Sequence, residues 1–187
     1  MVSALRLLQK QGYASTGVSE IAREGHAPMG SFYHHFPGGK EELAVAAMTV
    51  GAQEFEALLS QALESSDDLA ECLARIASDT ADTLQLSSWE RGCPVATTAL
   101  ETVFVSVELQ RTAAEAFERW TDLIRARMSQ AGYSADDAAE LATTVLAMVE
   151  GAELLARVHR STEPLALVAN SLRRLTWQAA AGEPGSA

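Results

Sequence analysis

The sequence predicts an all-α protein of about nine helices, and three observations support this prediction. Apolar residues make up 48% of the chain, but aromatic residues make up only 6%. Ala, Leu and Glu are frequent, and such side chains lose little rotamer freedom in a helix. Apolar positions recur at spacings of three and four residues, and turn residues cut this pattern into roughly nine pieces.

The 187 residues suffice for a small head on a larger body, and the charge is divided in the same way. The net charge is -11, yet residues 1–48 hold four basic and four acidic groups, whereas residues 49–187 hold ten basic and twenty-one acidic ones. A neutral segment therefore precedes an acidic one. We predict a three-helix head over residues 1–48, a larger helical bundle over 49–180 and a flexible tail over 181–187.

Three short helices are predicted in the head. A first apolar stripe ends near Gly12, and a second helix spans Val18 to Glu24. Pro28 fits the first position of a third helix, because its missing N–H costs nothing there, and Pro37 ends that helix after Phe36. Two short helices joined by a tight turn are the pattern of a helix-turn-helix, whose second helix lies in the DNA major groove.

The third helix is expected to have one apolar and one polar side. At about 100° per residue, Phe32 and Phe36 point to one side. The polar side combines a bare glycine with hydrogen-bonding groups, which are Gly30, Ser31, Tyr33 and His34. A backbone without a side chain can approach a base pair or phosphate closely, and the neighbouring groups can donate to phosphate oxygens. Lys40 adds a cation near the free N–H groups that start the next helix.

These segments resemble a known family. GYASTGVSEIA and GSFYHHFPGGKEEL, within residues 12–43, closely resemble the N-terminal signature of the tetracycline-repressor (TetR) family of bacterial transcriptional regulators, particularly its LmrA/YxaF-like branch. GCPVATTALE and the closing pair of helices are similar to the C-terminal domain of that branch. The resemblance implies a dimeric, all-helical, ligand-responsive repressor that releases its operator DNA when a small molecule enters the C-terminal domain. Repression is the commoner mode in the family, and activation stays open.

The resemblance also assigns roles to residues. Ser15 and Thr16 match positions that touch phosphate at the start of the second helix, and Lys40 matches a phosphate-binding lysine. The recognition helix is matched by Gly30, Ser31, Tyr33, His34 and His35.

Two departures from the family pattern stand out. His26 occupies a turn position where the family commonly has glycine, which implies a histidine with positive φ. Met1 falls inside the first helix, whereas the family usually begins earlier, often with a basic arm. A short start and an absent arm both stay open.

Four helices are predicted between the head and the last pair. The first would link the head to the body. They run from about Lys40 to Leu63, from Leu69 to Leu84, from Pro94 onward, and along the stripe from Leu109 to Ile124.

The last two helices are expected to form an interface. Ser134 with Asp137 makes an N-terminal cap for a helix that reaches about His159 and is apolar on more than one side, so it needs two apolar neighbours. The final helix is entered through Thr162 and Pro164, and its apolar seam comprises Leu165, Val168, Leu172 and Leu175. Two such helices from each of two chains make a homodimer with a four-helix interface. A bundle within one chain stays the alternative.

A pocket for a largely apolar inducer is predicted in the body. Its candidate residues are Trp89, Phe104, Phe117, Trp120, Met128, Met148 and Glu150. Plain core packing is the alternative for each aromatic residue. Glu150 is the first choice for a polar group facing the pocket, because it lacks a cation four residues away, whereas Glu153 can pair with Arg157.

Other classes of protein find little support. The chain has no nucleophile-elbow, zinc-protease or phosphate-loop motif, so we expect no enzyme and no cofactor. Cys72 and Cys93 lack metal spacing, so we expect no metal site and interpret both as buried thiols, with redox sensing as the alternative. No membrane span or signal peptide is present, which predicts a cytoplasmic protein. The competing function is an acidic, helical small-molecule-binding protein without DNA recognition.

Overall fold

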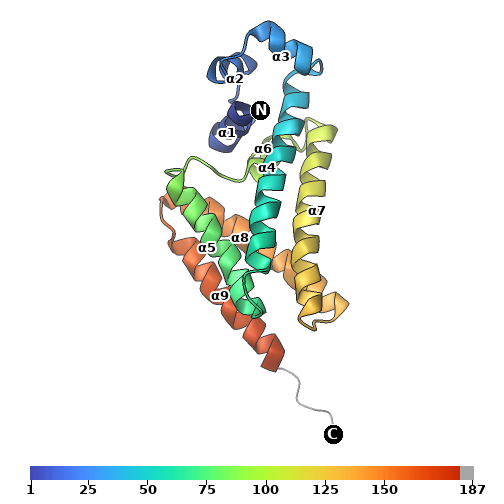
Figure 1. Cartoon of the computed structure of the whole chain (residues 1–187), viewed down its shortest axis with the longest axis vertical. Coiled ribbons are helices and arrows are strands. Elements are labelled where there is room, and N and C mark those ends of the chain that lie inside the picture. The colour runs from blue at the N-terminus through green and yellow to red at the C-terminus, as the bar shows by residue number, and fades with distance from the viewer. Residues whose placement is uncertain (182–187) are drawn as a thin grey trace. The chain divides into compact units, whose positions relative to one another are not determined.

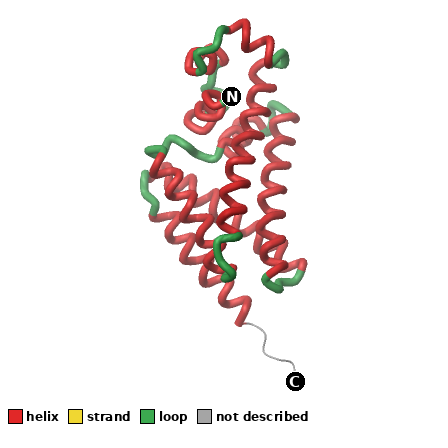
Figure 2. The backbone as a smooth tube through the Cα atoms, viewed as in Figure 1, coloured by secondary structure: helices red, strands yellow, loops and turns green. Residues whose placement is uncertain are grey.

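The computed structural model describes residues 1–181, with side chains through Arg174. Leu175 of the predicted seam therefore lies outside the described side chains, and the predicted tail lies outside the described residues except for Ala181. Within the described part every regular element is a helix, which confirms the all-α fold class (Figure 2). The helices are α1 (Val2–Gln11), α2 (Val18–Glu24), α3 (Met29–His35), α4 (Gly39–Leu63), α5 (Leu69–Leu86), α6 (Pro94–Thr102), α7 (Val107–Gln130), α8 (Ala135–His159) and α9 (Glu163–Ala181) (Figure 1).

The chain forms two compact units that each combine separated segments. The first unit comprises Met1–Phe55 and Glu90–Glu118, and the second comprises Glu56–Trp89 and the chain from Arg119 onward. The first unit thus contains α6 and the start of α7 as well as α1 to α3. The division at residue 48 stays a prediction, and the compact unit around it is larger than the three-helix head.

The core of the first unit lies where α1, α4 and α6 approach each other. Leu5, Leu7 and Leu8 of α1 are buried. At Gly51 of α4, an added Cβ would lie 2.5 Å from Cγ of Pro94 and 2.8 Å from Cδ1 of Leu5. Position 51 therefore requires glycine, because Pro94 and Leu5 approach its backbone too closely for a side chain. The glycine lets α4 pack tightly against both α1 and α6.

The second unit is built on α5, α8 and α9, which lie side by side (Figure 1). Ser134 caps α8 as predicted, by accepting the N–H of Asp137 at 3.1 Å. Asp68 caps α5 by accepting the N–H of Ala70 at 2.8 Å. The buried side chains at the centre include Leu73, Ile76, Val145, Leu165 and Leu172.

Two arginines stabilise the second unit. Arg173 of α9 makes a forked ion pair with Glu71 of α5, with nitrogen–oxygen distances of 2.8 and 3.0 Å. Arg127 of α7 donates to the carbonyl oxygens of Leu63, Ser66 and Asp67, at and just after the end of α4. The hydrogen bond to Leu63 satisfies a carbonyl that the end of α4 leaves without an intrahelical partner, and the other two hold the loop that follows.

The starts of α3 and α6 and the two cysteines were predicted from the sequence, and the structure corrects some of these predictions and confirms others. Pro28 is the N-cap of α3, with φ -63° and ψ 143°, rather than its first helical residue. Pro94 opens α6 as predicted. Cys72 is buried, but Cys93 is only half-buried, because it lies outside α6 as the N-cap and its sulfur accepts the N–H of Ala96 at 3.3 Å.

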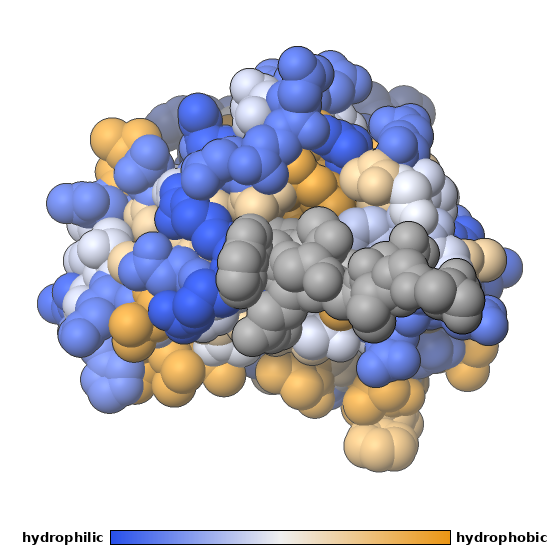
Figure 3. Space-filling view, turned by 90° about the horizontal axis from the view of Figure 1, so that it is seen from below, coloured by the Kyte–Doolittle hydropathy of each residue, from blue (hydrophilic) through white to orange (hydrophobic). Residues whose placement is uncertain are grey.

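Surface composition adds two facts. Among the helices of residues 1–181, none has the length and hydropathy needed to cross a membrane. Hydrophobic side chains nevertheless reach the surface among the hydrophilic ones, and one edge of the view in Figure 3 shows several of them. Many of the large apolar residues that are exposed lie in two places, one at the junction of α6 and α7 and one on α8 and α9.

Candidate nucleic-acid interface

The turn between α2 and α3 is closed by a residue in the left-handed region. His26 has φ 49°, as its place in the predicted turn implies. The N–H of Ala27 donates to the carbonyl oxygen of Ala22 at 2.9 Å, which ties the turn back onto α2. The turn therefore keeps the form of a helix-turn-helix although histidine stands where glycine would adopt this φ most easily.

Helix α3 is held by an aromatic cluster on its inner side. Phe32 is buried, and its ring centroid lies 5.7 Å from that of Phe36 and 5.0 Å from that of Tyr33. The Phe32–Tyr33 pair is T-shaped, so the edge of one ring meets the face of the other, which is a favourable arrangement for aromatic side chains. The predicted apolar side of α3 is thus the anchored side.

The outer side of α3 carries polar groups around an open glycine. Tyr33 is 57% exposed, and His34 and His35 are exposed with their ring centroids 5.3 Å apart. Ser31 is half-buried. A Cβ at Gly30 would meet no atom within 4 Å, so packing within the described structure does not require glycine there. The lack of a side chain instead leaves the backbone accessible to a binding partner.

The turn between α1 and α2 separates the two predicted phosphate-binding residues. Ser15 is exposed. Thr16 is only 1% exposed, and its hydroxyl donates to the carbonyl oxygen of Gly12 at 2.6 Å. In this structure Thr16 therefore holds the turn, and Gly12 supports it by adopting a φ of 79°. A hydrogen bond from the Thr16 hydroxyl to phosphate would require the turn to open.

Lys40 differs from the other basic side chains of residues 1–48. Those three are each paired with a carboxylate, as Arg6 with Glu24, Lys10 with Glu90 and Arg23 with Glu20. The ammonium of Lys40 lies 4.2 Å from the centroid of the Tyr13 ring. Partial burial lowers the pKa of Lys40, and the negative charge of Glu101 opposes this effect.

Together these groups offer donors from three neighbouring parts of the chain. They come from the turn before α2, the outer side of α3 and the first turn of α4. Hydroxyl, phenol, imidazole and ammonium groups can all donate to phosphate oxygens, and α3 has the dimensions to enter a major groove. In the described residues no group of three or more His, Cys, Asp or Glu side chains has the arrangement of a metal site.

The predicted inducer residues differ widely in burial, and Phe104 lies on the surface. Phe104 is 98% exposed in the segment between the end of α6 at Thr102 and the start of α7 at Val107. Phe117 belongs to the first unit, whereas Trp120 is fully buried in the second. Trp89 is half-buried, and its carbonyl oxygen accepts from Nε of Arg157 at 3.3 Å. Met128 is buried, and Glu150 is half-buried on α8.

A groove between α8 and the start of α9 was not predicted. It has a volume of about 660 Å³, and of the predicted inducer residues it includes only Met148. The other residues lining it include Gly151, Leu155, His159, Pro164 and Leu167. The sequence pattern indicated an apolar seam on these helices, but a helical wheel cannot distinguish a packed seam from an open groove.

Comparison with protein families agrees with this geometry. The model described as "Transcriptional regulator LmrA/YxaF-like, C-terminal domain" matches residues 69–171, and the model described as "Bacterial regulatory proteins, tetR family" matches residues 1–47. The chain belongs to the TetR family. The resemblance found in the sequence is thereby confirmed, and the protein is a DNA-binding transcriptional regulator.

Relatives and solved structures extend the match along the TetR fold. The HTH-type transcriptional regulators YxaF and LmrA of Bacillus subtilis are each 34% identical to this chain, over 91% and 87% of it and over 89% and 87% of their own lengths. The regulatory protein TetR from Rhodobacter sphaeroides has a TM-score of 0.83 at 27% identity, covering 92% of this chain and 96% of its own. CifR, solved with 26 bp operator DNA, shares the fold with a TM-score of 0.81 at 22% identity, covering 92% of this chain and 93% of its own.

Proposed function

We propose that this TetR-family regulator acts in the cytoplasm as a homodimer that represses transcription and releases its operator when a largely apolar small molecule binds. The observation that carries the DNA-binding part is the outer side of α3, where Tyr33 and His34 flank an open Gly30. His35 of α3 would add a hydrogen bond from the same side, and Ser15 and Lys40 would add others from the flanking segments. Thr16 would support them by holding the turn.

An exposed apolar surface on α8 and α9 supports the dimer. Leu154, Leu155, Val158 and Leu167 are each more than half exposed, and they adjoin or line the groove between these helices. Monomeric proteins rarely leave large contiguous apolar patches exposed to water. A second copy related by two-fold symmetry would cover the same surface on both protomers and would present two α3 helices to half-sites about 34–36 Å apart or a multiple of this spacing.

The inducer part rests on the residues of the second unit. Glu150 of α8 and the buried Trp120 are the groups we propose to contact the ligand, with Trp89 at the edge. Met148 lines the groove that we assign to the dimer, and Phe117 and the exposed Phe104 are less suited. A ligand shifts the equilibrium only by its preference for the non-binding conformation, and about 1.4 kcal/mol of coupling changes DNA affinity tenfold. An unchanged ligand response in Glu150→Gln would remove Glu150 from this proposal.

The direct test is fluorescence anisotropy with DNA fragments from around the gene of this protein. Lys10 and Lys40 are the only two lysines of the chain, so Lys10→Ala is a control of matched charge for Lys40→Ala. We expect one fragment to bind saturably, Lys40→Ala and Tyr33→Phe to bind it about tenfold more weakly, and Lys10→Ala to bind as the wild type does. The slope of log affinity against log salt should become shallower in Lys40→Ala by about one for each phosphate that the lysine neutralises.

The alternative outcome is equally informative. If no fragment binds at low salt, the acidic small-molecule-binding protein becomes the leading function. If a fragment binds but Lys40→Ala and Lys10→Ala behave alike, the protein binds DNA and the proposed phosphate contact of Lys40 is wrong.

A further inference from the structure

A carboxylate from α6 lies against the turn that carries the phosphate-binding groups. Oε2 of Glu101 accepts the N–H of Ala14 at 2.6 Å, although the two residues are 87 positions apart. The same carboxylate covers Gly12, where an added Cβ would lie 2.2 Å from Oε1 of Glu101. Glu101 therefore contacts the turn on both sides of Tyr13.

Tyr13 links this carboxylate to Lys40. The ammonium nitrogen of Lys40 lies 4.2 Å from the centroid of the Tyr13 ring. A change in the turn that moves Tyr13 would therefore also affect Lys40. The turn is fixed further from inside, because Thr16 donates its backbone N–H to the carbonyl oxygen of Tyr13 at 3.1 Å and its hydroxyl to that of Gly12. Glu101 is also close enough to Lys40 to act on its charge, since it opposes the lowering of the lysine pKa by burial.

The negative charge of Glu101 is electrostatically unfavourable in two respects. It lies in the last turn of α6, where a negative charge opposes the helix dipole. It also lies beside groups that we propose to contact phosphate, where a carboxylate repels DNA. Neither the stability of α6 nor charge attraction to DNA explains an acidic residue here, whereas the hydrogen bond to Ala14 does.

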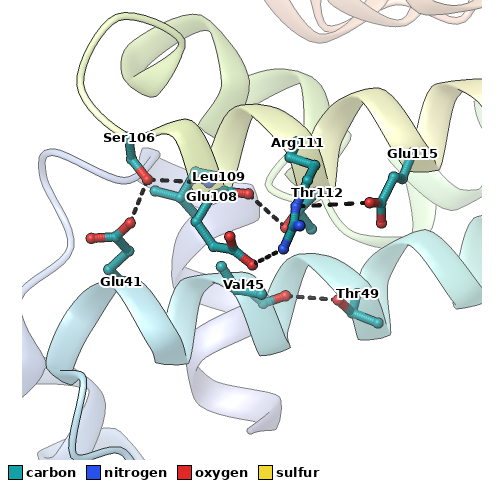
Figure 4. A network of polar contacts seen from close by, with 9 residues as sticks. All are labelled: Glu41, Val45, Thr49, Ser106, Glu108, Leu109, Arg111, Thr112 and Glu115. Carbon is teal, nitrogen blue, oxygen red and sulfur yellow. Dashed lines mark hydrogen bonds and ion pairs between the residues drawn. The ribbon is translucent and has the colours of Figure 1, made fainter.

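A second hydrogen bond from the same part of the chain reaches the residue next to Lys40. The hydroxyl of Ser106 donates to Oε1 of Glu41 at 2.5 Å and accepts the N–H of Leu109 at 3.1 Å, so it joins the start of α7 to the first turn of α4 (Figure 4). Glu101 and Ser106 thus bind the residues next to Tyr13 and Lys40, which are Ala14 and Glu41.

We propose that Glu101 is a positioning residue for DNA binding: it touches no DNA but orders the turn from Gly12 to Thr16 and so holds Ser15 and Lys40 in place for phosphate. This inference rests on the proposed function, since it concerns the same DNA-binding surface. It predicts that DNA binding needs the hydrogen-bond acceptor at position 101 but does not need its negative charge.

Two substitutions separate these properties. Glu101→Gln keeps an oxygen that accepts the N–H of Ala14 but removes the charge, whereas Glu101→Ala removes both. Glu90→Ala is the matched control, because Glu90 is another carboxylate of the first unit and pairs with Lys10 at 2.7 Å instead of with the turn. Anisotropy on the DNA fragment bound by the wild type should show Glu101→Ala about tenfold weaker. Glu101→Gln should equal or exceed the wild type, and Glu90→Ala should lie within about twofold of it.

Lysine acetylation read by mass spectrometry supplies a measurement that needs no DNA. In Glu101→Ala the ratio of acetylation at Lys40 to that at Lys10 should rise at least about twofold, because the turn no longer holds Tyr13 under the ammonium. Glu101→Gln should leave the ratio unchanged. A general loss of folding would raise both rates together and would lower the melting temperature, so it is distinguishable from the release of Lys40 alone.

The outcomes separate this inference from the proposed function. If Lys40→Ala weakens DNA binding but Glu101→Ala binds as the wild type does, the surface binds DNA and the positioning role of Glu101 is wrong. Equal weakening by Glu101→Gln and Glu101→Ala would also overturn it, because charge would then be the cause. If the wild type binds no DNA, the proposed function fails, and an unchanged acetylation ratio in Glu101→Ala would reject the positioning role as well.

Discussion

The outer side of α3 and the exposed surface of α8 and α9 are both open to solvent, but they offer a partner opposite chemistry. On α3, Tyr33 and His34 surround a backbone left bare at Gly30. On α8 and α9, the exposed side chains are leucine and valine, such as Leu155, Val158 and Leu167. On α3 a partner must replace the hydrogen bonds that water makes with polar groups. On α8 and α9 a partner gains free energy by removing apolar area from water.

The difference shows how one helical protein can keep apolar association on α8 and α9 separate from recognition by hydrogen bonds on α3. Each fully buried Leu or Val side chain contributes about 1.5–3 kcal/mol, and an apolar surface discriminates weakly between shapes that fit it. A hydrogen-bonding surface contributes less per group, but a mismatched donor or acceptor is costly. We therefore expect substitutions on α8 and α9 to affect assembly and substitutions on α3 to affect affinity for a particular DNA sequence.

The largest expected effect comes from placing charge on the apolar surface. Leu155→Glu combined with Leu167→Glu should weaken dimerisation at least about 100-fold, because a two-fold interface would bury each introduced carboxylate once in each protomer. Sedimentation velocity should show a monomer, and DNA affinity should fall with it. Leu86→Glu is the control, since Leu86 is 88% exposed at the end of α5, outside this surface. A dimer that survives the double substitution would place the interface elsewhere.

Two glycines sharpen the comparison, because each has open space around it. A Cβ at Gly30 or at Gly151 would meet no atom within 4 Å. Gly30→Ala should lower DNA affinity about tenfold or more, since the methyl group blocks close approach of the backbone. Thermal unfolding should show the melting temperature unchanged or higher, because alanine favours a helix over glycine. Unchanged DNA affinity would mean that α3 does not approach DNA at this position.

The second glycine tests the other surface. Gly151 lines the groove on α8, and Gly151→Ala should raise the dissociation constant of the dimer about tenfold if a partner helix packs closely there. DNA affinity measured at protein concentrations that keep the dimer intact should equal that of the wild type. If Gly151→Ala lowers DNA affinity at these concentrations, the two surfaces are not independent.

The smallest effect is expected from the ion pair between α5 and α9, which lies on neither surface. The hydrogen bond from Arg173 lowers the pKa of Glu71 below its ordinary value of 4.5. The pair therefore stabilises the fold at neutral pH, and this contribution is lost as the pH falls below about 4.5. Because the pair is exposed, Glu71→Gln should lower the melting temperature at pH 7 by at most about 2 °C, and the difference should shrink near pH 3. A larger loss at low pH would contradict this sign.

The sequence predicted best those features that depend on neighbouring residues. Pro94 and Ser134 mark the starts of α6 and α8 as expected, because capping and proline geometry involve only the first turn of a helix. The same local argument placed Pro28 one position too far into α3, since proline suits the N-cap as well as the first helical position. The positive φ of His26 followed from its place in the turn.

Features that depend on distant residues escaped prediction. Nothing near Glu101 in the sequence indicates its hydrogen bond to Ala14, because the partner lies 87 residues away along the chain and only the packing of α6 brings the two together. Hydrophobicity alone assigns Phe104 to a pocket, whereas its side chain is 98% exposed between α6 and α7. Thr16 is a different case: the resemblance assigned it to phosphate, and its hydroxyl donates to the carbonyl oxygen of Gly12, four residues earlier.

The pairing of cations in residues 1–48 has a consequence for how the protein finds its site. Arg6, Lys10 and Arg23 each face a carboxylate, so few counterions are released when random DNA is encountered. We therefore expect binding to random DNA to be weak, with a shallower dependence on salt than binding to the operator. Discrimination between operator and random DNA would then depend mainly on the groups of the outer side of α3 and on Lys40.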